Sequence, residues 1–168
     1  MKRCVTCKGT EFTATTRVKT YKFRHGVATV EIPAVKCATC GEGYLKGLDV
    51  QLGELAVARD LATMGPVNGE TFAFMRSAMG MPAAALADLF NLRPETISRW
   101  ENDKAKVDRA AHQLLATILL EQLEKGRTST VDRLVALAEQ REALHLFRPS
   151  KAAVARTETH WSHARKHA

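Results

Sequence analysis

From residue 48 onward, apolar residues recur three or four positions apart, the spacing that places side chains on one face of an α-helix. Glycine and proline interrupt this pattern at Gly65-Pro66, Gly80 and Gly126, where helices are expected to end. The sequence therefore predicts a run of helices, over residues 48–64, 69–79, 82–90, 94 to beyond 100, 107–125 and 130–147.

The helix predicted over 107–125 has a long apolar stripe, made of Val107, Ala111, Leu114, Leu115, Ile118, Leu119 and Leu123. The stripe exceeds the needs of a small domain, and we expect it to pack across a dimer.

Residues 1–47 differ from the rest, because they are rich in Thr, Val, Lys and Gly. The stretch from Phe12 to Ile32 is β-prone, and His25-Gly26 is a plausible turn. This pattern predicts two or three short antiparallel strands.

The formal net charge of the 168-residue chain is +7, with basic ends and a slightly acidic middle. Such a charge favours an anionic partner, first nucleic acid and second a membrane surface. No apolar run is long enough to cross a membrane, and no secretory signal stands at the N-terminus. We therefore expect a cytoplasmic protein with no membrane partner. Disulfides are rare in proteins of that compartment.

The four cysteines form two CxxC pairs separated by 29 residues, namely Cys4 and Cys7, and Cys37 and Cys40. Two CxxC turns brought together by a hairpin provide the tetrahedral thiolate set that Zn²⁺ prefers. Gly9 and Gly41 are expected to supply the tight turns. Four thiolates leave no position for a catalytic water, so the predicted Zn²⁺ is structural. A redox role would instead require one reactive pair on a thioredoxin-like unit.

The segment 81–102 has the spacing of two helices joined by a tight turn. The residues expected in the buried angle between these helices are Leu86, Ala87, Leu92, Ile97 and Trp100. Asn91 stands at the turn, where a positive φ is needed and Asn tolerates it. The pattern predicts a helix-turn-helix.

Polar residues on and beside the second helix of this motif are the types that contact DNA in a major groove. The candidate DNA-binding residues are Arg93, Glu95, Thr96, Ser98, Arg99, Asn102 and Lys104. The side chains of Lys104 and Lys106 either contact DNA phosphates or are simply solvated at the end of a helix. Arg99 either contacts DNA or braces a neighbouring glutamate, Glu95 or Glu101.

The segment Thr96-Ile97-Ser98-Arg99-Trp100-Glu101-Asn102 resembles the recognition helix of the phage-repressor-like (Cro/C1, XRE) helix-turn-helix family. The resemblance covers residues 69–105. Three positions depart from the family pattern. Pro82-Ala83 stand where Thr-Gln is common, Asn91 replaces the usual turn Gly, and Arg93 replaces the usual N-cap Ser.

A CxxC–hairpin–CxxC-Gly-Glu module before such a motif is similar to MqsA-type (YgiT-type zinc-finger) antitoxins and regulators. The resemblance covers residues 1–125 and includes Ile32 to Cys37 and the Gly41-Glu42 pair. It implies a homodimer on a palindromic operator, autoregulation of an operon and a toxin partner. The region beyond residue 125 is longer than in a compact antitoxin.

Together these features predict an α+β fold, in which a small N-terminal β zinc module with two CxxC knuckles precedes an all-α helix-turn-helix domain with extra C-terminal helices. The predicted divisions are a zinc module (1–47), a linker helix (48–68), the helix-turn-helix (69–106), C-terminal helices suited to dimerisation (107–148) and a basic mobile tail (149–168).

Three functions remain open at this stage. The chain is a DNA-binding transcriptional regulator, a zinc-module adaptor that binds proteins and no longer reads DNA, or a zinc-dependent or redox enzyme. No residues stand at the spacing of a known catalytic set or phosphate loop, so we expect no enzyme activity.

Overall fold

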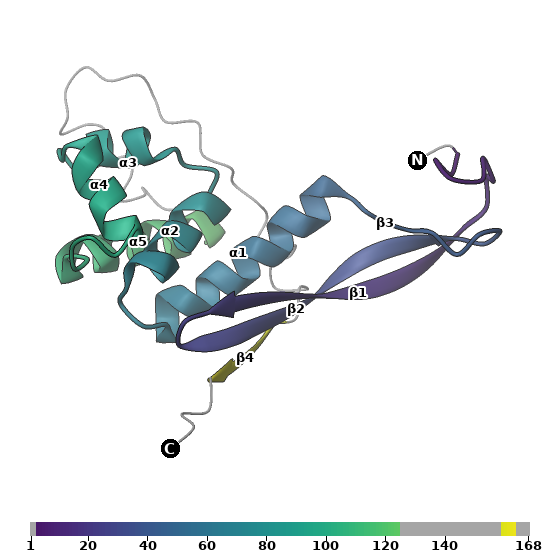
Figure 1. Cartoon of the computed structure of the whole chain (residues 1–168), viewed down its shortest axis with the longest axis horizontal. Coiled ribbons are helices and arrows are strands. Elements are labelled where there is room, and N and C mark those ends of the chain that lie inside the picture. The colour runs from purple at the N-terminus through teal and green to yellow at the C-terminus, as the bar shows by residue number, and fades with distance from the viewer. Residues whose placement is uncertain (1–2, 125–158, 164–168) are drawn as a thin grey trace.

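The computed structural model describes residues 3–124 and the backbone of residues 159–163. Figure 1 shows a long two-stranded ribbon with the helices gathered towards one end. The elements in chain order are β1 (Phe12–Phe23), β2 (Gly26–Cys37), β3 (Gly43–Leu45), α1 (Gly47–Met64), α2 (Gly69–Ala78), α3 (Ala83–Leu89), α4 (Pro94–Glu101), α5 (Arg109–Leu123) and β4 (Thr159–His163). The fold is α+β, as predicted. The helix predicted over 130–147 lies outside the described residues.

The ribbon consists of β1 and β2, which pair antiparallel along their whole length, from Phe12 opposite Cys37 to Phe23 opposite Gly26. Both strands have 12 residues and are longer than the short strands expected from the sequence. The turn consists of Arg24 and His25, one residue earlier than predicted. From Gly26 to Ala34 every second residue of β2 is buried, so one face of this part of the ribbon faces the helices.

The other edge of β2 pairs with two short strands. β3 pairs with residues 34–36, near the cysteines, and β4 pairs with residues 26–30, near the hairpin turn. Residues 159–163, which belong to the predicted mobile tail, instead pair with β2 as β4. A free edge of β2 offers unpaired backbone groups to any extended segment, and local sequence pattern does not reveal such a partner.

The core extends without interruption from the ribbon into the helices, and α1 lies at its centre. Residues 55–58 of α1 are fully buried, because β2 packs on one side of this helix and α2 and α5 on others. Gly53 allows the close approach to β2, since a Cβ there would lie 3.1 Å from Ile32. The predicted linker helix is therefore the central helix of one shared core.

The apolar stripe of α5 is buried within this chain. Leu115, Ile118, Leu119 and Leu123 are buried in the shared core, and α5 packs against α1 and α2. The predicted packing of this stripe across a dimer is therefore not needed to bury it, because α1 supplies the apolar surface within the chain. Among the described residues, no helix has the length and apolar character needed to cross a membrane.

Candidate metal centre and nucleic-acid interface

The four cysteines meet at the end of the ribbon that lies away from α3 and α4 (Figure 1). Their Sγ atoms all lie within 4.8 Å of one another, and all four are free thiols. The pairs Cys4–Cys40 and Cys7–Cys37 are separated by 3.5 and 3.6 Å between sulfur atoms. A tetrahedral ion bound at about 2.3 Å holds its thiolates about 3.8 Å apart. The cluster therefore has the dimensions to hold a metal ion.

The two CxxC turns have the same backbone hydrogen bonds. In each, the first cysteine donates its N–H to the carbonyl five residues later, Cys4 to Gly9 and Cys37 to Glu42, both at 2.8 Å. In each, the residue four positions later donates back to the first cysteine, at 3.0 Å from Lys8 and 2.9 Å from Gly41. This repeated turn directs the two sulfur atoms of each pair towards the other pair.

The position that donates back has a positive φ in both turns, +65° at Lys8 and +77° at Gly41. Gly41 has the tight-turn role predicted for it, whereas in the first turn Lys8 has that role instead of the predicted Gly9. Gly9 is required for a different reason, since a Cβ there would lie 2.8 Å from the hydroxyl of Thr39. Gly9 thus allows the two turns to pack closely.

Tyr44 of β3 is a neighbour of the cluster that the sequence analysis did not identify. Its hydroxyl lies 3.0 Å from the Sγ of Cys4 and accepts a hydrogen bond from the N–H of Val5 at 3.1 Å. The ring is held against Phe12 with centroids 6.0 Å apart. When Cys4 is a thiolate it has no hydrogen to donate, so the Tyr44 hydroxyl is then the donor in this contact. No spacing rule identifies such a contact, which joins residues 40 positions apart.

The turns also set the acidity of the thiols. The backbone N–H of Cys7 and then the hydroxyl of Tyr44 lower the pKa of Cys4 to about 6, and the backbone N–H of Cys40 lowers the pKa of Cys37. The N–H of Glu42 favours the Cys40 thiolate, but the adjacent thiols, Cys7 first, and burial raise its pKa to about 12. Four thiolates repel one another at this distance, so a cation is needed to keep all of them ionised.

At the other end of the molecule, α3 and α4 pack against each other across a short turn. Asn91 in this turn has a φ of +53°, which confirms the prediction of a positive φ there. Leu86, Ala87, Ile97 and Trp100 are buried between the helices and Leu92 is half-buried, as predicted. Arg93 is the N-cap residue of α4 and makes no side-chain capping hydrogen bond.

The outward face of α4 is polar. Glu95, Ser98 and Arg99 are exposed and Thr96 is half-buried, while Ile97 and Trp100 point into the core. Asn102 is the C-cap residue of the helix, and its side-chain amide donates to the carbonyl of Ser98 at 2.7 Å. The structure thus places the predicted side chains on one surface, with the Asn102 amide engaged by the helix itself.

Arg99 makes no ion pair within the part of the chain that the structure describes, so it does not brace Glu101. Glu101 pairs instead with Arg76 of α2, through two contacts of 2.5 and 3.0 Å. Arg76 also donates to the carbonyl of Met81 at 2.6 Å. Both charged side chains are mostly buried. This pair, which the sequence analysis missed, fixes α4 relative to α2 and leaves Arg99 directed to solvent.

Lys104 is exposed directly beyond α4, in a segment that folds back on the last turn of the helix. The backbone N–H groups of Lys104 and Ala105 donate to the carbonyl of Arg99, at 2.8 and 3.2 Å. This places the predicted basic residue beside the polar face of α4.

Comparison with models of protein families, with curated proteins and with solved structures finds no match to this chain. The interpretation of the two sites therefore depends on their geometry and chemistry.

Proposed function

We propose that this protein is a sequence-specific DNA-binding transcriptional regulator of the repressor type, with α3 and α4 as its helix-turn-helix. The observation that carries the proposal is the polar outer face of α4, which presents Thr96, Ser98 and Arg99 while Arg76 and Glu101 anchor the helix from behind. Helices of this kind enter the major groove and read base edges with side chains of these types. The charge of +7 supports an anionic partner.

The cysteine cluster is proposed to bind one structural Zn²⁺ per chain. Four thiolates with tetrahedral spacing suit Zn²⁺, and they leave no open position for a substrate or water. The ion would hold together the end of the ribbon where β1 is exposed from Thr13 to Val18 and contributes little core.

The hydroxyl of Tyr44 is expected to strengthen this site. Tyr44→Phe removes the hydrogen bond to Cys4 and should weaken Zn²⁺ affinity by about 10-fold or more, as the loss of a group that hydrogen-bonds to a metal ligand commonly does. Affinity is measured by competition with a chelator. The control is Tyr21→Phe, which removes a hydroxyl bonded to Glu54 and remote from the cysteines. Equal affinities in the two variants would show that the Tyr44 contact does not act on the metal.

The resemblance to MqsA-type antitoxins supports two further parts of the proposal. The protein would act as a homodimer, with two copies of α4 in major grooves about 34–36 Å apart on a palindromic operator. A toxin protein would be its partner, and the operon would be autoregulated. Co-expression with the product of any small neighbouring gene, followed by purification of the complex, tests the toxin partner.

Arg99 is expected to contribute specificity. Arg99→Ala should cost about 1–3 kcal/mol per half-site and relax the preference at one base position if the guanidinium reads guanine. If it binds phosphate, affinity for operator and scrambled duplexes should fall together. Stability should change little, because the side chain is exposed. The measurement is a binding titration on the promoter of the protein's own gene and on a scrambled duplex, with thermal melts alongside.

The matched control is Arg17→Ala, which removes an exposed guanidinium from β1, away from α4. It should leave the preference for operator over scrambled DNA unchanged. If Arg99→Ala remains folded and binds operator as tightly as the unmodified protein, α4 is not the reader, and the adaptor function gains support.

A further inference from the structure

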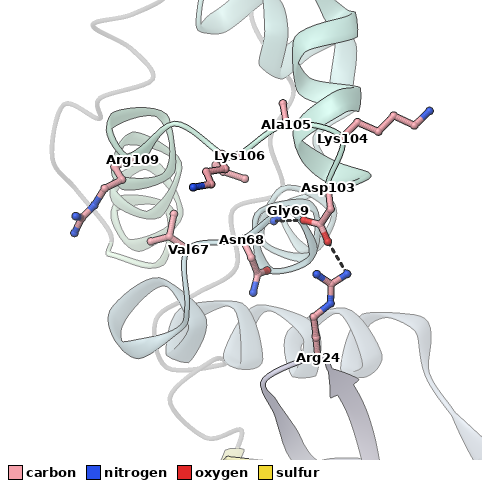
Figure 2. Close-up of a pocket in the computed structure, with 10 residues that line it drawn as sticks. Arg24, Val67, Asn68, Gly69, Asp103, Lys104, Ala105, Lys106 and Arg109 are labelled. Atoms are coloured by element: carbon pink, nitrogen blue, oxygen red, sulfur yellow. Dashed lines mark hydrogen bonds and ion pairs between the residues drawn. The ribbon is translucent and has the colours of Figure 1, made fainter.

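A groove of about 780 Å³ opens where the hairpin turn meets the segment that follows α4. Figure 2 shows its walls, with Arg24 of the hairpin turn on one side and the chain from Asp103 to Arg109 on the other. The starts of α2 and α5 complete it. We call it the basic groove, because its charged lining residues are Arg24, Asp103, Lys104, Lys106 and Arg109.

The charge of the basic groove is not balanced internally. Asp103 is its one carboxylate, and it is already engaged by Arg24 at 2.7 Å and by the N–H of Gly69 at 3.3 Å. Lys104, Lys106 and Arg109 make no ion pair with any residue that the structure describes. Unpaired cations in the lining and at the rim create a local positive potential that favours an anion.

The ion pair between Arg24 and Asp103 joins the two walls of the groove. The backbone N–H of Arg24 also donates to the carboxylate of Glu70 in the first turn of α2, at 2.8 Å. The hairpin turn therefore has two contacts with the helical part, one at the start of α2 and one in the segment that follows α4. In Figure 2 the guanidinium of Arg24 points to Asp103, whereas the side chain of Lys104 extends away from the groove.

The groove begins beside the last turn of α4, because two of its lining residues, Lys104 and Ala105, donate their N–H groups to the carbonyl of Arg99. Its free cations are all exposed on the rim. Exposed cations along an open groove suit a long polyanion, which binds by releasing counterions. A small anion would instead need buried donors that desolvate and enclose it.

We propose that the basic groove binds backbone phosphates of the same DNA that α4 reads, so that the DNA contact extends from α4 to the tip of the β1–β2 hairpin. The inference depends on the proposed function. Lys106 and Arg109 bind the phosphates, and the Arg24–Asp103 pair positions the hairpin wall. Such contacts fix the register of the protein on the duplex and carry no sequence information themselves.

The test compares Lys106→Gln/Arg109→Gln with Arg17→Gln/Lys46→Gln, which removes one lysine and one arginine from exposed positions outside the groove. Both double variants lose the same net charge. Affinity is measured against salt concentration, on duplexes selected from a random library by the unmodified protein and on a random duplex. The groove variant should show a salt slope shallower by about 1.8 per bound protomer on both DNAs. The control should retain the original slope, and melts check that both are folded.

Equal slopes for the two double variants, while the unmodified protein binds DNA, would overturn the groove proposal and leave the proposed function intact. Failure of the unmodified protein to bind any duplex would overturn both. A titration with inorganic phosphate, followed by NMR shifts of the backbone amides of residues 104–109, tests whether a free anion is the ligand. Saturable phosphate binding that a duplex does not displace would contradict the DNA contact.

Discussion

Cys37→Ser is expected to abolish tight Zn²⁺ binding and to unfold the cysteine end of the ribbon. Three thiolates remain, and the loss in affinity should exceed the roughly 10–100-fold effect of removing a group that only supports a ligand. Structural Zn²⁺ sites contribute on the order of 10 kcal/mol of binding free energy, and this free energy is available only to the folded module. Zinc content is measured by elemental analysis of freshly purified, reduced protein.

The structure limits how far this unfolding should spread. Phe23, Val30 and Ile32 belong to the core around α1, and this half of the ribbon should stay protected in hydrogen exchange. Protection should be lost around the two CxxC turns and in β1 from Thr13 to Val18, where the side chains are exposed.

The control for this variant is Ala38→Ser, which introduces the same side chain at an exposed position next to Cys37. It should retain one Zn²⁺ per chain and the original exchange pattern. Absence of zinc from the unmodified protein, or an unchanged zinc content in Cys37→Ser, would refute the proposed metal centre.

Glu101→Gln should be among the most destabilising single changes outside the metal centre. It leaves the mostly buried guanidinium of Arg76 without its anion, and breaking a buried pair in this way costs about 3–5 kcal/mol. The cost should be visible as a lower midpoint of denaturant unfolding. DNA affinity should also fall, because Arg76 holds α4 against α2 and contacts the carbonyl of Met81 before α3.

Two comparisons make this prediction specific. Arg59→Met breaks the more exposed pair between Arg59 and Asp60 within α1 and should cost no more than about 1 kcal/mol. The double variant Arg76→Met/Glu101→Leu removes both charges and should recover part of the stability lost in Glu101→Gln. If Glu101→Gln costs no more than Arg59→Met, the pair does not anchor α4.

The features that the sequence predicted correctly depend on residues close together in the chain. The CxxC spacing determined how each pair presents its two sulfur atoms, because each turn is formed within six residues. The positive φ of Asn91 and the inward faces of Ile97 and Trp100 follow from helix period and turn chemistry, which are also local. The helices up to residue 123 were placed within about two residues of their bounds for the same reason.

The remaining features depend on contacts between distant segments. The pairing of β4 with β2, the central position of α1, and the ion pairs of Arg76 with Glu101 and of Arg24 with Asp103 join residues that no local pattern relates. The same is true of Tyr44 at Cys4. The sequence by itself thus determined the residue types at the two candidate sites, the positions of the CxxC pairs and the inward and outward faces of α4. Only the tertiary structure decided which groups support those sites, because partner choice depends on how the chain packs and not on spacing along it.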